Sequence, residues 1–256
     1  MAPVEDLALR VCLFDHLEVW VDGQRVDVQT LRREARTLLK RMALERGRTL
    51  TKAELIDAVY GPEDGDFDKR WRALKPRFTE LRLFLEPGLA ALKRRGVKQP
   101  GRRSRFIKSA SGTYRFDASK AVCWVDVEAF EEEVRRGEGL LAARKWRQAA
   151  EAFQRAVDLY RGDLLRTDPY EAWVAPFRTR CADRLVDALE GMAHAQLELG
   201  AFDPAADWCA KALDQRAALA RDHQHERPQL EGVYRLKMRA HHYAGDPQGV
   251  KQAFDA

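Results

Sequence analysis

The chain has 256 residues, of which 45% are hydrophobic and 33% charged, and its formal net charge is +5. This length accommodates two ordinary domains, and the composition is typical of a globular protein. No run approaches the ~18 consecutive apolar residues of a membrane span. The acidic N-terminus also lacks the basic start and apolar core of a signal peptide. We therefore expect a cytoplasmic protein with no membrane partner.

The charge is divided unevenly along the chain. Residues 1–120 contain 26 Lys and Arg against 17 Asp and Glu, a net of +9, whereas residues 121–256 contain 19 against 23, a net of −4. Such asymmetry points to a polyanionic partner for the basic half. It also predicts two domains with different roles, at 1–120 and 121–256.

A β-hairpin and a helix are predicted at the start of the basic half. Residues 9–28 alternate apolar and polar side chains around Asp22-Gly23, a dipeptide that favours a tight turn. Apolar residues at helical spacing then predict a helix at about 31–46. Gly47 ends this helix.

Two further helices follow. The second begins at Thr51, and Glu54 lies three residues on, which is the spacing of a capping box. The third is expected at 67–85, where apolar side chains recur every three or four residues. Its predicted buried seam consists of Trp71, Leu74, Phe78, Leu81 and Leu85.

The remaining surface of the third helix is basic. Arg72, Lys75, Thr79 and Arg82 lie on one flank, and Arg77 lies on the other. Such a helix can enter the major groove of DNA, where arginines reach guanine edges and phosphates. A solvated basic face explains the same pattern, and the spacing alone does not decide between the two interpretations.

A basic segment follows the third helix. Nine Lys and Arg and no acidic residue occur between 87 and 116. Residues 93–105 show no periodicity and are expected to form a loop, whereas 106–116 alternates around Ser111-Gly112 and predicts a second hairpin. A short basic hairpin after a helix-turn-helix is a wing that can lie along the DNA backbone.

This order of hairpin, three helices and hairpin resembles the OmpR/PhoB-type winged-helix DNA-binding domain. The resemblance is carried by Thr49–Gly61, Leu81–Pro87 and Ile107–Phe116. It implies that the third helix is the recognition helix and that the loop from Gly61 to Asp66 faces RNA polymerase. The residues expected to contact DNA are Arg72, Lys75, Arg77, Thr79, Arg82, Arg102, Arg103, Arg105, Lys108 and Thr113. Those expected in the polymerase-contact loop are Gly61, Glu63, Asp64 and Asp66.

The acidic half reads as helices from Trp124 onward, with degenerate repeats of the tetratricopeptide type. Segments 143–157 and 200–213 both place an aromatic residue, then Ala-Ala, then Ala and an aliphatic residue, and 245–254 is a weaker copy. Trp146, Trp173 and Trp208 are expected in the repeat core. The predicted fold class is therefore mainly α with small β-sheets, a winged helix-turn-helix domain followed by an α-helical repeat domain.

Residues 159–165, Glu171–Trp173 and the helix around 178–197 are similar to the bacterial transcriptional activator domain. In the Streptomyces antibiotic regulatory protein family that domain follows an OmpR-type winged helix, and this order matches the present chain. The resemblance implies a sequence-specific transcriptional regulator, an activator that binds promoter direct repeats as a homodimer on double-stranded DNA and contacts RNA polymerase.

A second interpretation remains open. Pro76 lies inside the third helix, where it removes a backbone hydrogen bond and is expected to kink the helix. A winged helix that has lost DNA binding would leave a helical-repeat scaffold for protein interactions.

Chemistry-bearing motifs are missing from the sequence. It contains no P-loop, no GxGxxG after a strand, no GxSxG and no HExxH. The histidine pairs His223/His225 and His241/His242 do not converge on one helical face. We therefore expect no enzyme activity, no metal and no cofactor. The four cysteines lack ligand spacing and are expected to be buried free thiols: Cys12, Cys123, Cys181 and Cys209.

Overall fold

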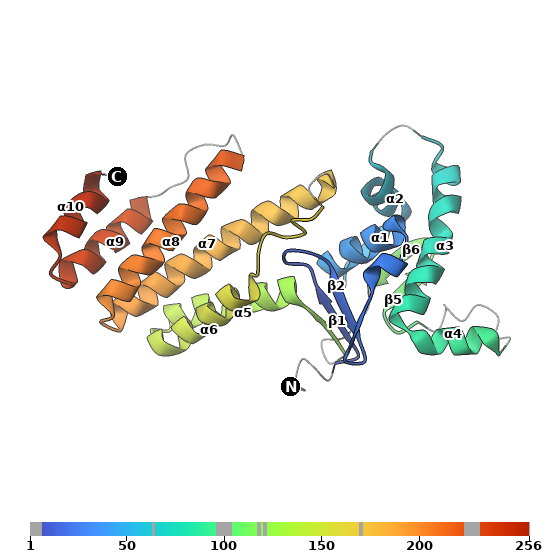
Figure 1. Cartoon of the computed structure of the whole chain (residues 1–256), viewed down its shortest axis with the longest axis horizontal. Coiled ribbons are helices and arrows are strands. Elements are labelled where there is room, and N and C mark those ends of the chain that lie inside the picture. Colours follow the sequence, from blue (N-terminus) through green and yellow to red (C-terminus); the bar gives the residue numbers. More distant parts are fainter. Residues whose placement is uncertain are drawn as a thin grey trace. The chain divides into compact units, whose positions relative to one another are not determined.

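The computed structural model describes residues 7–62, 65–95, 104–116, 119, 122–168, 171–222 and 231–255, without the side chains of 90–93 and 220–222. The chain forms two compact units. The first comprises residues 1–126 together with 167–173, and the second comprises 127–166 and 174–256. Each unit is considered by itself, and Figure 1 gives the element labels.

The first unit begins with a four-stranded sheet in the order β3-β2-β1-β7. Its strands are β1 (Leu9–Cys12), β2 (Glu18–Val21), β3 (Gln24–Val26) and β7 (Cys123–Val125). The predicted hairpin turn is confirmed, because Asp22 and Gly23 both have positive φ, as a two-residue hairpin turn requires. The short strand β7 pairs in parallel with β1, although the sequence led us to expect helices from Trp124 onward.

Three helices follow, as predicted. They are α1 (Arg33–Leu44), α2 (Lys52–Tyr60) and α3 (Phe67–Leu85). The capping box is present, since the Thr51 hydroxyl accepts from the Glu54 N–H and the Glu54 carboxylate accepts from the Thr51 N–H. The third helix has the predicted bounds and continues through Pro76.

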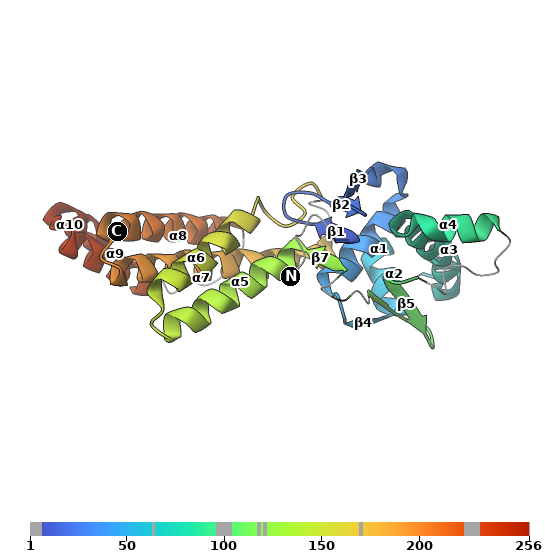
Figure 2. The same cartoon turned by 90° about the horizontal axis from the view of Figure 1, so that it is seen from below.

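The wing is a three-stranded sheet in the order β4-β6-β5. Strands β5 (Ile107–Ala110) and β6 (Thr113–Phe116) form the predicted hairpin, with Ser111 and Gly112 at positive φ. Strand β4 (Thr49–Thr51) was expected to be only the approach to a helix, but it pairs with β6. The first part of the expected basic loop is also different, because Pro87–Arg94 forms a helix, α4, with proline at its first position (Figure 2).

The second unit consists of helices that pack as neighbours in chain order. They are α5 (Asp126–Ala142), α6 (Trp146–Leu159), α7 (Ala175–Glu198), α8 (Phe202–Asp222), α9 (Glu231–Tyr243) and α10 (Pro247–Asp255). Helices α7 and α8 lie side by side in both views (Figures 1 and 2). Small residues line the contacts, since Ala149, Ala152 and Ala205 are fully buried. The predicted fold class is confirmed.

Two expectations about aromatic and sulfur side chains have different outcomes. Trp173 lies in the first unit, with the Arg41 guanidinium 5.4 Å from its ring centroid, and so it is not part of the repeat core. The four cysteines are buried free thiols, as predicted. Burial raises the pKa of Cys123 to about 11 and that of Cys209 to about 12, which keeps both protonated at neutral pH.

Among the described residues, no helix is long and apolar enough to cross a membrane. The same part of the chain contains no cluster of three or more potential metal ligands. His223 and His225 lie outside the described residues, whereas His241 bonds Asp246 through Nδ1 at 3.0 Å.

Candidate nucleic-acid interface

The third helix presents one polar face to solvent. Arg72, Lys75 and Thr79 are exposed and follow one another at spacings of three and four residues, which places them on the same side of α3. The opposite side is buried through Leu74, Phe78, Leu81 and Leu85. Trp71 is only half-buried, and its ring centroid lies 5.4 Å from that of Tyr114 in the wing. The helix is therefore held from one side, and three of the predicted contact residues remain accessible.

Glu80 connects α3 to the beginning of α1. Its Oε1 accepts a hydrogen bond of 2.8 Å from the backbone N–H of Arg32, the N-cap residue of α1. Its other carboxylate oxygen forms an ion pair with Arg77 on the same helix. Because Arg77 is half-buried and already paired, it holds Glu80 in place, and its charge is partly neutralised within the helix.

Arg82 connects the same helix to the wing. Its Nε donates to the Ile107 carbonyl and its Nη2 to the Ser109 hydroxyl, both at 3.2 Å. Burial lowers the pKa of Arg82 and raises that of Tyr114, which lies beside it. Stacking of Phe78 on Tyr114, with ring centroids 4.1 Å apart, completes this junction. Arg82 thus fixes the angle between helix and wing, a use that the helical pattern did not indicate.

The wing residues predicted to contact DNA lie near the surface. Lys108 is exposed, although its Nζ donates to the Ser104 carbonyl at 2.7 Å. Thr113 is half-buried and donates to the Ala110 carbonyl at 2.7 Å, which closes the hairpin turn. Both side chains therefore begin from defined positions.

Arg105 lies where the chain enters the wing. The buried carboxylate of Glu86 accepts from the Arg105 N–H at 2.9 Å and from the Ser104 hydroxyl. The Arg105 guanidinium remains 55% exposed, 3.7 Å from Glu86. Its charge is therefore partly shared with Glu86 and partly available to a ligand. Arg102 and Arg103 lie outside the described residues.

The predicted polymerase-contact loop is described only at its two ends. Gly61 ends α2 with a φ of +81°, a conformation that favours glycine. Asp66 is the N-cap of α3 and accepts from the Lys69 N–H at 3.0 Å. Glu63 and Asp64 lie outside the described residues. Asp66 therefore stabilises α3, in addition to any role in binding.

Lys52 was missed by the sequence analysis. It is the first residue of α2, and its Nζ lies 5.2 Å from the ring centroid of Trp71. Its side chain also passes the wing turn, where a Cβ built on Gly112 would lie 3.3 Å from Lys52 Cε. Lys52 thus adds a positive charge between α2, α3 and the wing. The capping box, which places it at the start of α2, was the available signal.

Comparisons with known proteins give a family match and two similar proteins. Residues 125–252 match the model of the bacterial transcriptional activator domain. The regulatory protein AfsR of Streptomyces coelicolor is 27% identical over 241 residues, which are 94% of this chain and 21% of AfsR. The structure of Mycobacterium tuberculosis EmbR in complex with a low-affinity phosphopeptide aligns with a TM-score of 0.71 at 20% identity, over 97% of this chain and 58% of that one. The chain thus spans about one fifth of the curated relative and less than two thirds of the solved one.

Proposed function

Because the chain belongs to the bacterial transcriptional activator domain family, as a regulator of the Streptomyces antibiotic regulatory protein type, we propose that it binds duplex DNA through α3 and the wing. The family consists of transcriptional regulators rather than enzymes. The observation that carries the proposal is the face of α3, where Arg72, Lys75 and Thr79 are exposed while the opposite side is buried.

The dimensions and chemistry of this face suit the major groove. The groove is about 12 Å wide, which admits one α-helix. Arg72 and Lys75 supply donors for the two acceptors on the guanine edge, and the Thr79 hydroxyl can bond a base or a phosphate. Arg77 and Arg82 hold α3 against α1 and the wing through Glu80 and Ile107. In this proposal they position the helix, and they do not read bases.

The wing and its surroundings supply contacts to the backbone. Arg105, Lys108 and Arg115 are exposed, and Lys52 lies between the wing and α3. Each phosphate that these cations neutralise releases counterions, so binding weakens as salt increases. Arg102, Arg103 and Thr113 remain predicted DNA contacts on the basis of the family resemblance.

The wider regulatory role follows from the family. We propose that the protein activates transcription from promoters with direct repeats, as a homodimer on DNA, and that the loop from Gly61 to Asp66 contacts RNA polymerase. This role places it in the cytoplasm. The scaffold alternative, with a winged helix that no longer binds DNA, predicts a protein without affinity for any duplex.

Selection from a random duplex pool tests the proposal. The full chain should enrich a defined motif, and Arg72→Ala and Lys75→Ala should each weaken binding to that motif by about 1–3 kcal/mol. Arg147→Ala is the matched control, because Arg147 is exposed on α6 in the second unit. A pool without enrichment, or an Arg72→Ala variant that binds as tightly as the control, would contradict the proposal.

A further inference from the structure

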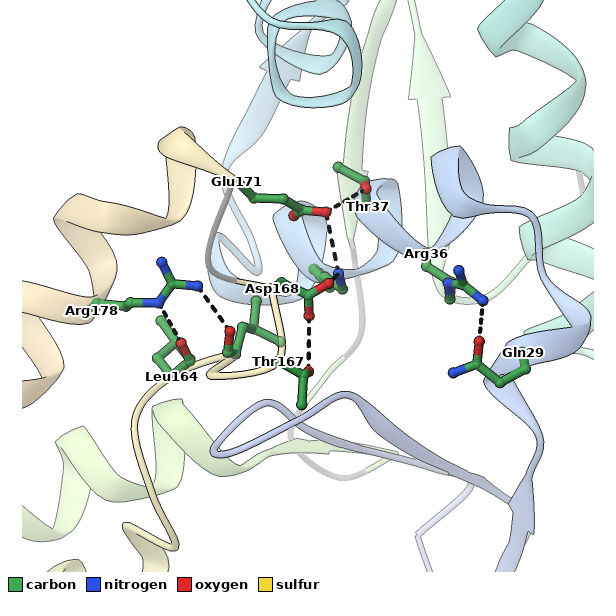
Figure 3. Close-up of polar contacts among 10 residues, drawn as sticks. Gln29, Arg36, Thr37, Leu164, Thr167, Asp168, Glu171 and Arg178 are labelled. Carbon is green, nitrogen blue, oxygen red and sulfur yellow. Dashed lines mark hydrogen bonds and ion pairs between the residues drawn. The ribbon is translucent and has the colours of Figure 1, made fainter.

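A segment of the activator half completes the winged-helix unit. Residues 167–173 follow α6 in the sequence and precede α7, yet they belong to the first unit. The Lys40 Nζ, on α1, lies 2.7 Å from Asp168 Oδ1 and 3.4 Å from Glu171 Oε1. The Thr37 hydroxyl donates to the same Glu171 oxygen at 3.1 Å (Figure 3). We call residues 167–173 the strap.

The strap presents Trp173 beside the end of α2. The indole lies against the Arg41 guanidinium and lines an open pocket of about 720 Å³ together with Tyr60, Gly61 and Pro62. These last residues begin the loop that is proposed to contact polymerase. The pocket therefore joins a segment of the activator half to the start of that loop within one unit.

The pocket has an apolar wall and two charged positions available to a ligand. Val59, Pro62 and Trp173 supply apolar surface. Among the charged lining residues, Glu171 is paired with Lys40, and Glu54 is engaged in the capping box. Arg33 and Asp57 are exposed, and neither side chain has a hydrogen bond or ion pair with any other described residue.

We propose that this pocket is a docking site for a segment of RNA polymerase in which an apolar side chain is flanked by an acidic and a basic residue. The apolar side chain enters against Trp173 and Pro62, while the two charges pair with Arg33 and Asp57. The inference rests on the proposed function, because the pocket shares Gly61 with the loop assigned to polymerase. It adds that the strap, and hence the activator half, forms part of that surface.

The test uses the full chain, its selected duplex and purified polymerase holoenzyme. Arg33→Glu and Asp57→Lys change exposed side chains and should reduce polymerase recruitment to the duplex by at least about tenfold, as expected of residues at the centre of an interface. Trp173→Ala should have a similar effect. DNA affinity should match that of the controls, Arg147→Glu and Trp208→Ala, which alter the second unit.

The outcomes separate this inference from the proposed function. Undiminished recruitment by Arg33→Glu and Asp57→Lys overturns the docking site, even if Trp173→Ala fails to fold. A changed oligomeric state of either charge variant, measured by sedimentation, also overturns it, because the occupant would then be a second copy of the chain. If the unaltered protein does not bind DNA, the proposed function itself fails.

Discussion

Lys40 and Asp168 form an ion pair of 2.7 Å across 128 positions of the sequence, and the Lys40 side chain is only 5% exposed. A buried ammonium group is costly unless it is paired, so this contact requires the strap to lie against α1. The chain thus leaves the winged-helix unit after β7 and returns to it between α6 and α7. The winged helix and the activator half are connected twice.

Lys40→Ala should therefore destabilise the first unit. Its removal leaves Glu171, which is 12% exposed, and Asp168 without their cation, and we expect a loss of about 2–4 kcal/mol. Urea unfolding of the full chain measures this loss. Lys69→Ala is the control, because Lys69 is exposed on α3 in the same unit. Equal stability of the two variants would show that the pairing contributes nothing.

The expected division of the chain at residue 120 leads to a second prediction. A chain of residues 1–120 lacks β7 and Asp126, whose buried carboxylate accepts from the N–H groups of Leu13 and Phe14 at 2.8–3.0 Å. Leaving buried donors unpaired costs about 1–3 kcal/mol each. Residues 1–120 should consequently melt at a lower temperature than residues 1–126 in a thermal scan. Identical melting would contradict this role of Asp126.

A third prediction concerns the contact between α6 and α7. A Cβ built on Gly191 would lie 2.3 Å from the Cζ of Phe153, so Gly191→Ala must displace a fully buried ring. We expect a loss of about 1–3 kcal/mol in chemical unfolding. Gly139→Ala is the matched control, because nothing lies within 4 Å of its built Cβ, and it should be neutral or slightly stabilising. Tolerance of Gly191→Ala would mean that the ring is not packed as described.

The capping box should make the stability of α2 depend on pH. The hydrogen bond from the Thr51 N–H holds the pKa of Glu54 below its usual 4.5. A lowered pKa means that the stabilisation is complete above pH 4.5 and is lost as the pH falls through the folded value. Glu54→Ala should thus cost about 0.5–1 kcal/mol at pH 7 and less in acid. Asp57→Ala, on the same helix, is the control, and a pH-independent difference between the variants would contradict the account.

Local patterns predicted much of the first unit. The bounds of α3, the Thr51 capping box and the turns at Gly23 and Gly112 were all evident, because each depends on residues close together in the sequence. The exposed positions Arg72, Lys75 and Thr79 also followed from helical spacing.

Distant partners explain what the sequence did not indicate. Strands β4 and β7 have three residues each and are defined by pairing with β6 and β1, so neither carries its own periodic signal. The strap depends on Lys40, far away in the chain. The role of Arg82 was similarly hidden, because helical spacing shows that a side chain shares a face but not that a wing strand will accept its hydrogen bonds.

The salt dependence of duplex binding tests the central claim most directly. Fluorescence anisotropy with the selected duplex should give a logarithm of the association constant that falls linearly with the logarithm of salt concentration, with a slope of about −0.9 for each phosphate neutralised. Lys108→Ala, which removes an exposed wing cation, should make that slope less steep by about 1. A slope near zero, or an affinity unaffected by Arg72→Ala and Lys108→Ala together, would contradict the assignment of α3 and the wing to DNA.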